Sequence, residues 1–224
     1  MMRHFDEQLQ ELLRKIILMG ATVEHMIQAS IRCLASGEQS LADEVFEKEK
    51  EVNRLQLEVD DHAVKLTALQ QPVAADVRFL FMASRIASEL ERIGDQADNI
   101  CQNARHILSQ PPLKPMVDIP LMAEAAQKMV REALTALSSR DVGGAEAVLE
   151  EEKRVDAFKD QIFRTLLTYM MADPGTIQRA IPLILVSRNL ERVGDHATNI
   201  AEEVIYMVQG RDVRHRAEMA ERGQ

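Results

Sequence analysis

One eleven-residue segment occurs twice in this chain, and the repetition constrains the fold more than any other feature. LERIGDQADNI at 90–100 and LERVGDHATNI at 190–200 are identical at 8 of 11 positions, at an offset of 100. Upstream, ADEVFEKEKEVNRL at 42–55 and AEAVLEEEKRVDAF at 145–158 share 6 of 14 residues at an offset of 103. Because the similar blocks keep their order along the chain, they indicate a tandem duplication, and the two halves are expected to share one architecture.

Each half is predicted to contain three helices, because apolar residues recur at three- and four-residue spacing and strand patterns are missing. The predicted helices span 9–36, 41–69, 73–108, 120–139, 145–171 and 174–208. Gly37 is expected to end the first helix, and Ser40 with Asp43 resembles a capping box for the second. Asp173 and Pro174 are expected to begin the last helix.

The fold class that follows is all-α, with two tandem, pseudo-symmetric, antiparallel three-helix bundles built from six long helices. Residues 1–109 are the predicted first repeat and 120–210 the second, joined by a Pro-rich linker at 110–119. Residues 211–224 are a charged tail that is expected to fray. Only 4% of the residues are aromatic and none is Trp, which favours an aliphatic, Met-rich helical core.

Charge and hydropathy exclude several classes of protein. A formal net charge of −9 with few aromatic residues is poorly suited to nucleic acid, which requires basic surfaces and stacking side chains. The apolar runs are far shorter than the ~20 residues of a membrane-spanning helix, and the N-terminus lacks the profile of a signal peptide. Cys33 and Cys101 form no CxxC motif and are expected to fill the core. A soluble cytoplasmic protein is therefore expected.

The repeated segment carries two acids one helical turn apart. On a helix that turns 100° per residue, Glu91, Asp95 and Asp98 lie within ~60° of one another, opposite the apolar stripe. Glu191 and Asp195 occupy the same positions in the second repeat. The carboxylates are therefore expected to form a row that faces away from the core of each bundle.

The preceding helix of each repeat carries a second polar row. Glu49 and Asn53 begin this row in the first repeat, and Glu152 and Asp156 begin it in the second. Because consecutive antiparallel helices are neighbours, the two rows of a repeat are expected to lie side by side and to gather four to five oxygens. Asn53 stands in place of an acid, which is expected to weaken the first site slightly.

A metal site would offset two features that are unfavourable on their own. Acids four residues apart repel by a few tenths of a kcal/mol, and a mid-helix glycine such as Gly94 or Gly194 costs about 1 kcal/mol relative to Ala. A bound divalent or multinuclear metal would neutralise the repulsion, and glycine would leave room for a close approach of an ion, a water molecule or a neighbouring backbone. Oxygen ligands suit Mg²⁺, Mn²⁺, Ca²⁺ and iron in a carboxylate cluster, and the identity among Mg, Mn, Fe or Zn is left open.

Two alternatives remain open at this point. The acids could form a solvated face that Arg92 and Arg192 screen, so that the repeat records only duplication. They could also belong to a carboxylate-bridged metalloenzyme, a hydrolase or oxidase, which requires a base or nucleophile beside the metal in a pocket that excludes water. Catalytic motifs, Gly-rich phosphate loops and Glu-x-x-His pairs are missing, so enzyme activity is not expected. His196 could extend the second site or lie on the surface.

The chain resembles the PhoU family over residues 6–215. The segments that carry the resemblance are LERIGD and LERVGD, LQQPVAADVR after the second helix, and LLTYMMADP in the second repeat. The resemblance implies two pseudo-symmetric three-helix bundles, usually in a homodimer, with metal clusters held on the bundle surface by E(D)xxxD acids. Carried onto this chain, the ligand pairs would be Glu91 with Asp95, Glu191 with Asp195, Glu152 with Asp156, and Glu49 with Asn53. The pair Glu49 and Asn53 departs from the strict motif, which puts metal occupancy of the first repeat in doubt.

The resemblance also implies a function. PhoU proteins are negative regulators of the phosphate-starvation response and of phosphate uptake. They are adaptors that couple the ATPase subunit of the phosphate ABC transporter to a phosphate-responsive sensor histidine kinase. By that resemblance the chain would be peripheral to the membrane only through these partners, and no nucleic-acid partner is expected.

Overall fold

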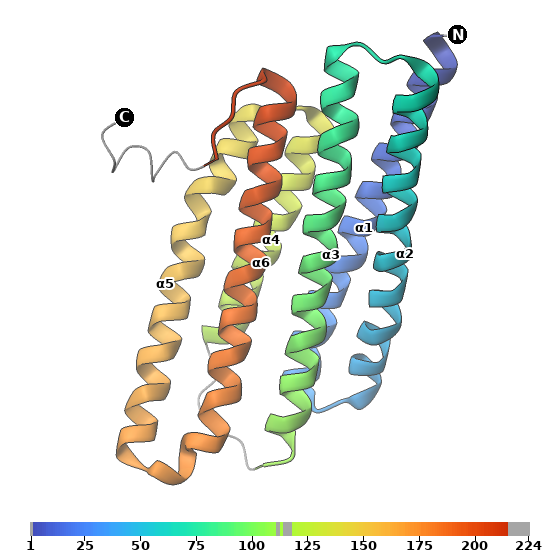
Figure 1. Cartoon of the computed structure of the whole chain (residues 1–224). Helices are drawn as coiled ribbons and strands as arrows, with labels where there is room; N and C mark the ends of the chain where they lie inside the picture. Colours follow the sequence, from blue (N-terminus) through green and yellow to red (C-terminus); the bar gives the residue numbers. More distant parts are fainter. Residues whose placement is uncertain (1, 111–112, 114–117, 215–224) are drawn as a thin grey trace.

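The fold was analysed in a computed structural model that describes residues 2–110, 113 and 118–214. Within these residues it is all-helical: α1 Met2–Ser36, α2 Gln39–Gln70, α3 Ala74–Leu108, α4 Asp118–Ser139, α5 Val142–Ala172, the 3-10 helix η1 Pro174–Thr176 and α6 Ile177–Gln209. The prediction of two antiparallel three-helix bundles is confirmed, with α1–α3 in the first and α4–α6 in the second (Figure 1). None of the described helices has an apolar stretch long enough to cross a membrane.

Two of the predicted helix ends have the expected local structure. Gly37 follows α1 with φ of 77° and donates its backbone N–H to the carbonyl oxygen of Cys33 at 2.9 Å. Asp173 accepts a hydrogen bond of 2.9 Å from the backbone N–H of Gly175. The turn that Asp173 caps is η1, however, so α6 begins three residues later than predicted.

The capping box predicted at Ser40 and Asp43 is wrong. Helix α2 already begins at Gln39, and its N-cap, Glu38, makes no side-chain capping hydrogen bond. The Ser40 hydroxyl instead donates to the Glu38 carboxylate at 2.9 Å. Ser40 is therefore the second residue of the helix, and its hydroxyl cannot act as the acceptor of an N-cap.

The chain segments outside the repeats differ in part from the prediction. Helix α4 begins at Asp118, two residues inside the predicted linker, most of which lies outside the described residues. The described part of the tail does not fray, because Arg211 pairs with Glu146 at 2.9 Å and Val213 is buried. The remainder of the predicted tail, 215–224, lies outside the described residues.

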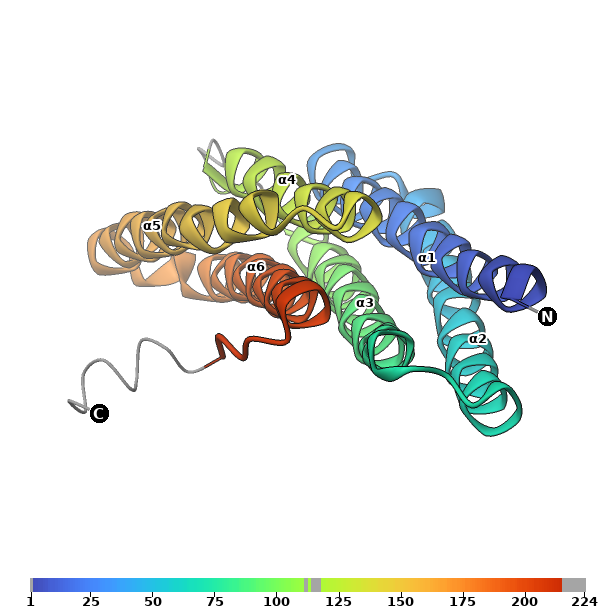
Figure 2. The same ribbon diagram turned by 90° about the horizontal axis from the view of Figure 1, so that it is seen from above.

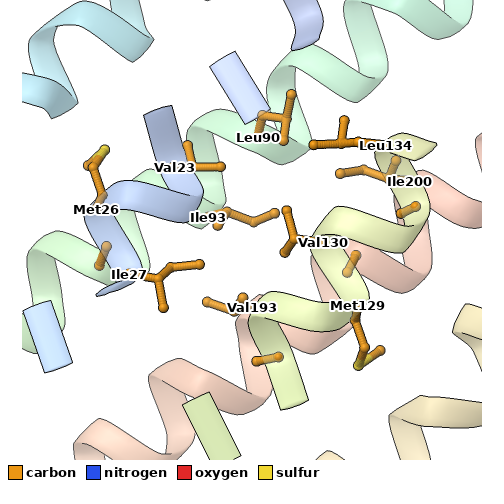
Figure 3. Close-up of a cluster of buried hydrophobic side chains, with 14 of the residues drawn as sticks. Val23, Met26, Ile27, Leu90, Ile93, Met129, Val130, Leu134, Val193 and Ile200 are labelled. Carbon is orange, nitrogen blue, oxygen red and sulfur yellow. The ribbon is translucent and has the colours of Figure 1, made fainter. Parts of the chain in front are cut away.

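The two bundles lie side by side and share one core. Helices α3 and α6 are antiparallel neighbours at the centre, α2 and α5 lie outermost, and α1 contacts α4 on the other side of the molecule (Figures 1 and 2). The residues that meet between the bundles are fully buried and include Val23, Ile27, Ile93, Val130 and Val193 (Figure 3). The third helix of each repeat is therefore buried on two sides, against its own bundle and against the other one.

Helices α1 and α4 are in close contact at Gly20. A Cβ atom at this position would lie 2.1 Å from Cδ1 of Leu134. Both residues are buried, so the leucine has little free space into which it could turn. The absence of a side chain at Gly20 therefore lets the two bundles pack against each other.

We expect Gly20→Ala to lower the free energy of unfolding by about 1–2 kcal/mol, because displacing Leu134 outweighs the better helix propensity of Ala. The matched control is Gly94→Ala, where the new methyl group would lie 3.5 Å from its nearest neighbour, Met26 Cε, in ordinary contact. This control should gain up to about 1 kcal/mol. Urea unfolding followed by circular dichroism measures both, and equal stability of the two variants would contradict the proposed packing constraint.

Candidate functional site

The structure brings the predicted acids of the first repeat together in the seam between α2 and α3. We define the first acid cluster as Glu49, Asn53, Glu91, Asp95 and Asp98. All five side chains are partly buried, and the charge of Glu49 on α2 acts on all three acids of α3. Ile93 points into the centre of the molecule (Figure 3), so the α3 acids lie on the opposite, outer side of that helix.

The first acid cluster concentrates negative charge. Burial raises the pKa of Glu91, and the charge of Asp95 raises it further. Burial followed by the charge of Glu49 raises the pKa of Asp95. Burial also raises the pKa of Asp98, although Gln102 donates a hydrogen bond of 2.6 Å to this carboxylate and partly offsets the rise. The ionised carboxylates are therefore less favourable here than in water, and positive charge would stabilise them.

Asn53 is not an acid, but the first acid cluster can still act as a set of metal ligands. Its Nδ2 donates to Oε1 of Glu49 at 2.5 Å. Its Oδ1 is buried and has no hydrogen-bond partner among the described residues. An unpaired buried acceptor is unfavourable by roughly 1–3 kcal/mol, so this oxygen would gain from a donor or a cation. The amide thus leaves an oxygen ligand in the seam where a carboxylate was expected.

The second acid cluster, defined as Glu152, Asp156, Glu191 and Asp195, lies between α5 and α6. Burial followed by the charge of Asp195 raises the pKa of Glu152. Burial followed by the charge of Glu191 raises the pKa of Asp195. Lys159 Nζ bridges the two helices, donating to Glu191 at 2.8 Å and to Asp156 at 3.3 Å. The second acid cluster is therefore partly neutralised by the chain itself.

The two acid clusters differ in how well they suit a metal. Carboxylate and amide oxygens are suitable ligands for hard cations. Within the described part of the chain, however, no three His, Cys, Asp or Glu side chains are arranged so that they could hold an ion. The carboxylates would have to turn toward a shared ion, and in the second cluster Lys159 would also have to leave. The first cluster, where Gln56 occupies the position equivalent to Lys159, therefore fits a cation better.

The prediction that the two repeated glycines leave room for an ion is wrong. Gly94 and Gly194 are buried against side chains of their own bundles. A Cβ atom at Gly94 would lie 3.5 Å from Met26 and 3.7 Å from Val52, and one at Gly194 would lie 3.4 Å from Val155. A side chain at either position would point into its own bundle and make ordinary contacts there, so these glycines do not open space for an ion.

A polar contact that the sequence analysis missed joins the two repeats beside the acid clusters. His196 Nδ1 lies 2.8 Å from Oε2 of Glu89, and Asn199 Nδ2 donates to the same oxygen at 3.0 Å. His196 is mostly buried, so it is an interior contact between α6 and α3 and not a surface residue. The hydrogen bonds from His196 and Asn199 outweigh burial and lower the pKa of Glu89, which favours its ionised form.

A second pair across the same boundary lies one turn away. Arg85 of α3 reaches Glu203 of α6 at 2.7 Å, and this carboxylate is almost fully buried. The positions equivalent to these two residues in the other repeat are Leu185 and Asn103, and neither is charged. A search for differences between the repeats, in addition to identities, could have found these residues.

The comparisons with known proteins agree with the fold of two three-helix repeats. The sequence profile described as the PhoU domain matches residues 16–104 and 119–204, one match in each bundle. The chain belongs to the PhoU family. A "Phosphate-specific transport system accessory protein PhoU homolog" from Pseudomonas aeruginosa is 36% identical over 214 residues, covering 95% of this chain and 88% of that protein. The "Phosphate-specific transport system accessory protein PhoU" of Escherichia coli K12 is 34% identical over 211 residues, which cover 94% of this chain and 88% of that protein.

Solved PhoU structures have the same fold. The crystal structure of PhoU from Pseudomonas aeruginosa superposes with a TM-score of 0.88 at 35% identity, covering 92% of this chain and all of that chain. A phosphate transport system regulatory protein PhoU from Streptococcus pneumoniae has a TM-score of 0.86 at 23% identity, covering 93% of this chain and 99% of that one. At that lower identity the likeness shows the fold alone.

In metal-free protein we expect Asp95→Asn to raise the thermal unfolding temperature at pH 7. The pKa of Asp95 is raised from its ordinary value of 3.8, so the folded chain keeps this proton to a higher pH than the unfolded chain does. The ionised group therefore destabilises the fold above the raised pKa, and this effect disappears as the pH falls to 3.8. The gain in the variant should likewise vanish on acidification. Asp160→Asn, at an exposed acid of α5, is the control, and an equal gain there would contradict the prediction.

Proposed function

We propose that this PhoU-family chain is an accessory regulator of phosphate transport, a negative regulator of the phosphate-starvation response and of phosphate uptake. The observation that carries the proposal is the family match in both repeats, together with relatives described as accessory proteins of the phosphate-specific transport system. The relatives reported above are described as accessory or regulatory proteins, so the alternative of a metalloenzyme receives no support from them.

The proposed mode of action is that of an adaptor. A cytoplasmic homodimer of this chain would couple the ATPase subunit of the phosphate ABC transporter to a phosphate-responsive sensor histidine kinase, and would reach the membrane only through these partners. The shared core supports this role physically, because it holds the outer surfaces of both repeats in one fixed arrangement. An adaptor needs such surfaces and does not need a catalytic group.

The proposed cofactor is a divalent or multinuclear metal, with Mg, Mn, Fe and Zn as candidates. The first acid cluster would hold it through carboxylates from both α2 and α3, and the second through carboxylates from α5 and α6. A bound cation would stabilise carboxylates that are partly withdrawn from water, offset the repulsion among them, and cross-link the two helices of each seam. The raised pKa of Glu91, Asp95 and Glu152 and the unpaired oxygen of Asn53 support the proposal.

Deleting the gene for this chain is expected to leave phosphate-starvation genes active in medium rich in phosphate. A reporter fused to a starvation promoter measures the effect, and a plasmid copy of the intact gene should restore repression. Repression that stays normal in the deletion strain would overturn the proposed regulatory role.

Neutralising both acid clusters is expected to lower bound metal severalfold. The variant combines four changes: Glu91→Gln, Asp95→Asn, Glu191→Gln and Asp195→Asn. Elemental analysis of purified protein measures the metal per chain, and circular dichroism shows whether the variant is folded. A control with Asp61→Asn and Asp160→Asn, both exposed acids outside the clusters, should keep the content of the unmodified protein. Equal metal in the fourfold variant would reject both sites.

A further inference from the structure

Two arginines line a small cavity at one end of the molecule. The cavity lies between the start of α3, the last turn of α6 and the α4–α5 connection, which meet at the top of Figure 1. Its volume is ≈ 130 Å³, far below the roughly 300–1,000 Å³ of a site for a drug-sized ligand, so it suits a small ion. The polar side chains in its lining are Asp76, Arg78 and Arg140, and Phe79, Met207 and Val208 form much of its apolar wall.

The two arginines have hydrogen-bond donors that the fold does not use. Within the described part of the chain, neither Arg78 nor Arg140 pairs with a carboxylate. Nε of Arg78 is withdrawn from water and has no acceptor among the described residues. A buried donor without a partner is unfavourable, and two cations that share a cavity repel each other. An anion in the cavity would correct both defects.

Arg140 also has a backbone conformation that arginine rarely adopts. Its φ is 55°, in the left-handed region, where the Cβ atom of an ordinary residue is crowded. The equivalent residue of the first repeat, at the offset of 103, is Gly37, with φ of 77°. Glycine adopts this conformation readily. The arginine is therefore unfavourable for the fold at this turn, which points to a role for its side chain outside folding.

Asp76 determines which anion fits the cavity. Among the described residues, no ion pair joins it to Arg78 or Arg140. An ionised carboxylate only accepts hydrogen bonds, so it repels an anion that carries no proton. At pH 7 inorganic phosphate keeps a proton that it can donate to Asp76, whereas sulfate and acetate keep none. The lining therefore favours phosphate over these two ions.

We propose that the cavity binds one inorganic phosphate ion, held by the guanidinium groups of Arg78 and Arg140 and selected by Asp76. Guanidinium groups donate paired hydrogen bonds that match the oxygens of a phosphate. The site is separate from both acid clusters and needs no metal. The argument for the site rests on these three side chains, and its use in regulation rests on the proposed function.

The test is equilibrium dialysis of the purified full chain with radiolabelled phosphate at constant ionic strength. One phosphate should bind per chain. Arg78→Gln with Arg140→Gly introduces the residues found at the equivalent positions, Gln178 and Gly37, and should weaken binding by about tenfold or more, since hydrogen bonds to a charged ligand are lost. Arg140→Gly alone should weaken binding severalfold and keep the fold, because glycine accepts the φ of this turn.

Arg164→Gln with Arg188→Gln is the matched control, because these exposed arginines of α5 and α6 lie outside the cavity and their removal changes the charge equally. The control should bind phosphate like the unmodified chain, and circular dichroism should show every variant folded. Equal binding by the cavity variant and the control overturns the proposal. Binding that disappears after dialysis against EDTA also overturns it, because the phosphate would then be held by a metal.

A second role for the arginines predicts a different result. Cations near the C-terminus of a helix are stabilising, and the last turn of α6 adjoins the cavity. If the arginines served α6 alone, the cavity variant would unfold at a lower temperature than the control, and the unmodified chain would bind no phosphate. That outcome overturns the proposal.

Competing ions identify the ligand. Sulfate, acetate and glycerol 3-phosphate should each displace the labelled phosphate at least about tenfold less well than unlabelled phosphate does, and Asp76→Asn should narrow the gap between phosphate and sulfate. Equal competition by sulfate or acetate in the unmodified chain overturns the choice of phosphate. Equal competition by glycerol 3-phosphate overturns the choice of the free ion and assigns the cavity to a phosphate ester.

The deletion experiment tests the regulatory role separately. A deletion strain that loses repression keeps the role even if the cavity binds no phosphate. Phosphate binding that depends on Arg78 and Arg140 stands even if repression survives deletion.

Discussion

The aliphatic contact between α3 and α6 is the interaction on which the arrangement of the outer surface depends. Ile93 and Val193 are fully buried where the two bundles meet, so the side of each helix opposite to them must face outward. Glu91 and Glu191 lie on that opposite side. Each acid cluster therefore lies on the outer side of its own central helix, and the two central helices, whose axes lie about 8–10 Å apart, fix how the clusters are placed relative to each other.

Much of the fold could be predicted because its determinants are local. Three- and four-residue periodicity defines helices, Gly37 ends one of them, and duplication transfers the interpretation from one half to the other. The contact between bundles could not be predicted in this way, since the pattern around Ile93 and Ile100 is the same for a helix buried on one side or two. Gly94 was misinterpreted for a related reason, because its sequence neighbours are acids but its spatial neighbours are Met26 and Val52.

The candidate site was predictable to the extent that it depends on helix geometry. Acids on consecutive antiparallel helices had to lie near one another, and Glu49 does act on Asp95 across the seam. The bridge made by Lys159 depends on a side-chain conformation, which no periodicity specifies. The contact of His196 with Glu89 depends on how the repeats pack. Both involve positions where the repeats differ. When the two halves are aligned, Lys159 is equivalent to Gln56 and Glu89 is equivalent to Asn189.

The shared core has a consequence for the evolution and handling of this protein. A single repeat released from its partner would expose the side of α3 that carries Ile93, or the side of α6 that carries Val193, to water. Such a half-molecule would cover that aliphatic surface by joining another half-molecule, so the ancestor of the duplicated gene is best pictured as a symmetric pair of three-helix chains. Fusion of the two genes then freed each half to diverge, as Lys159 and His196 now show.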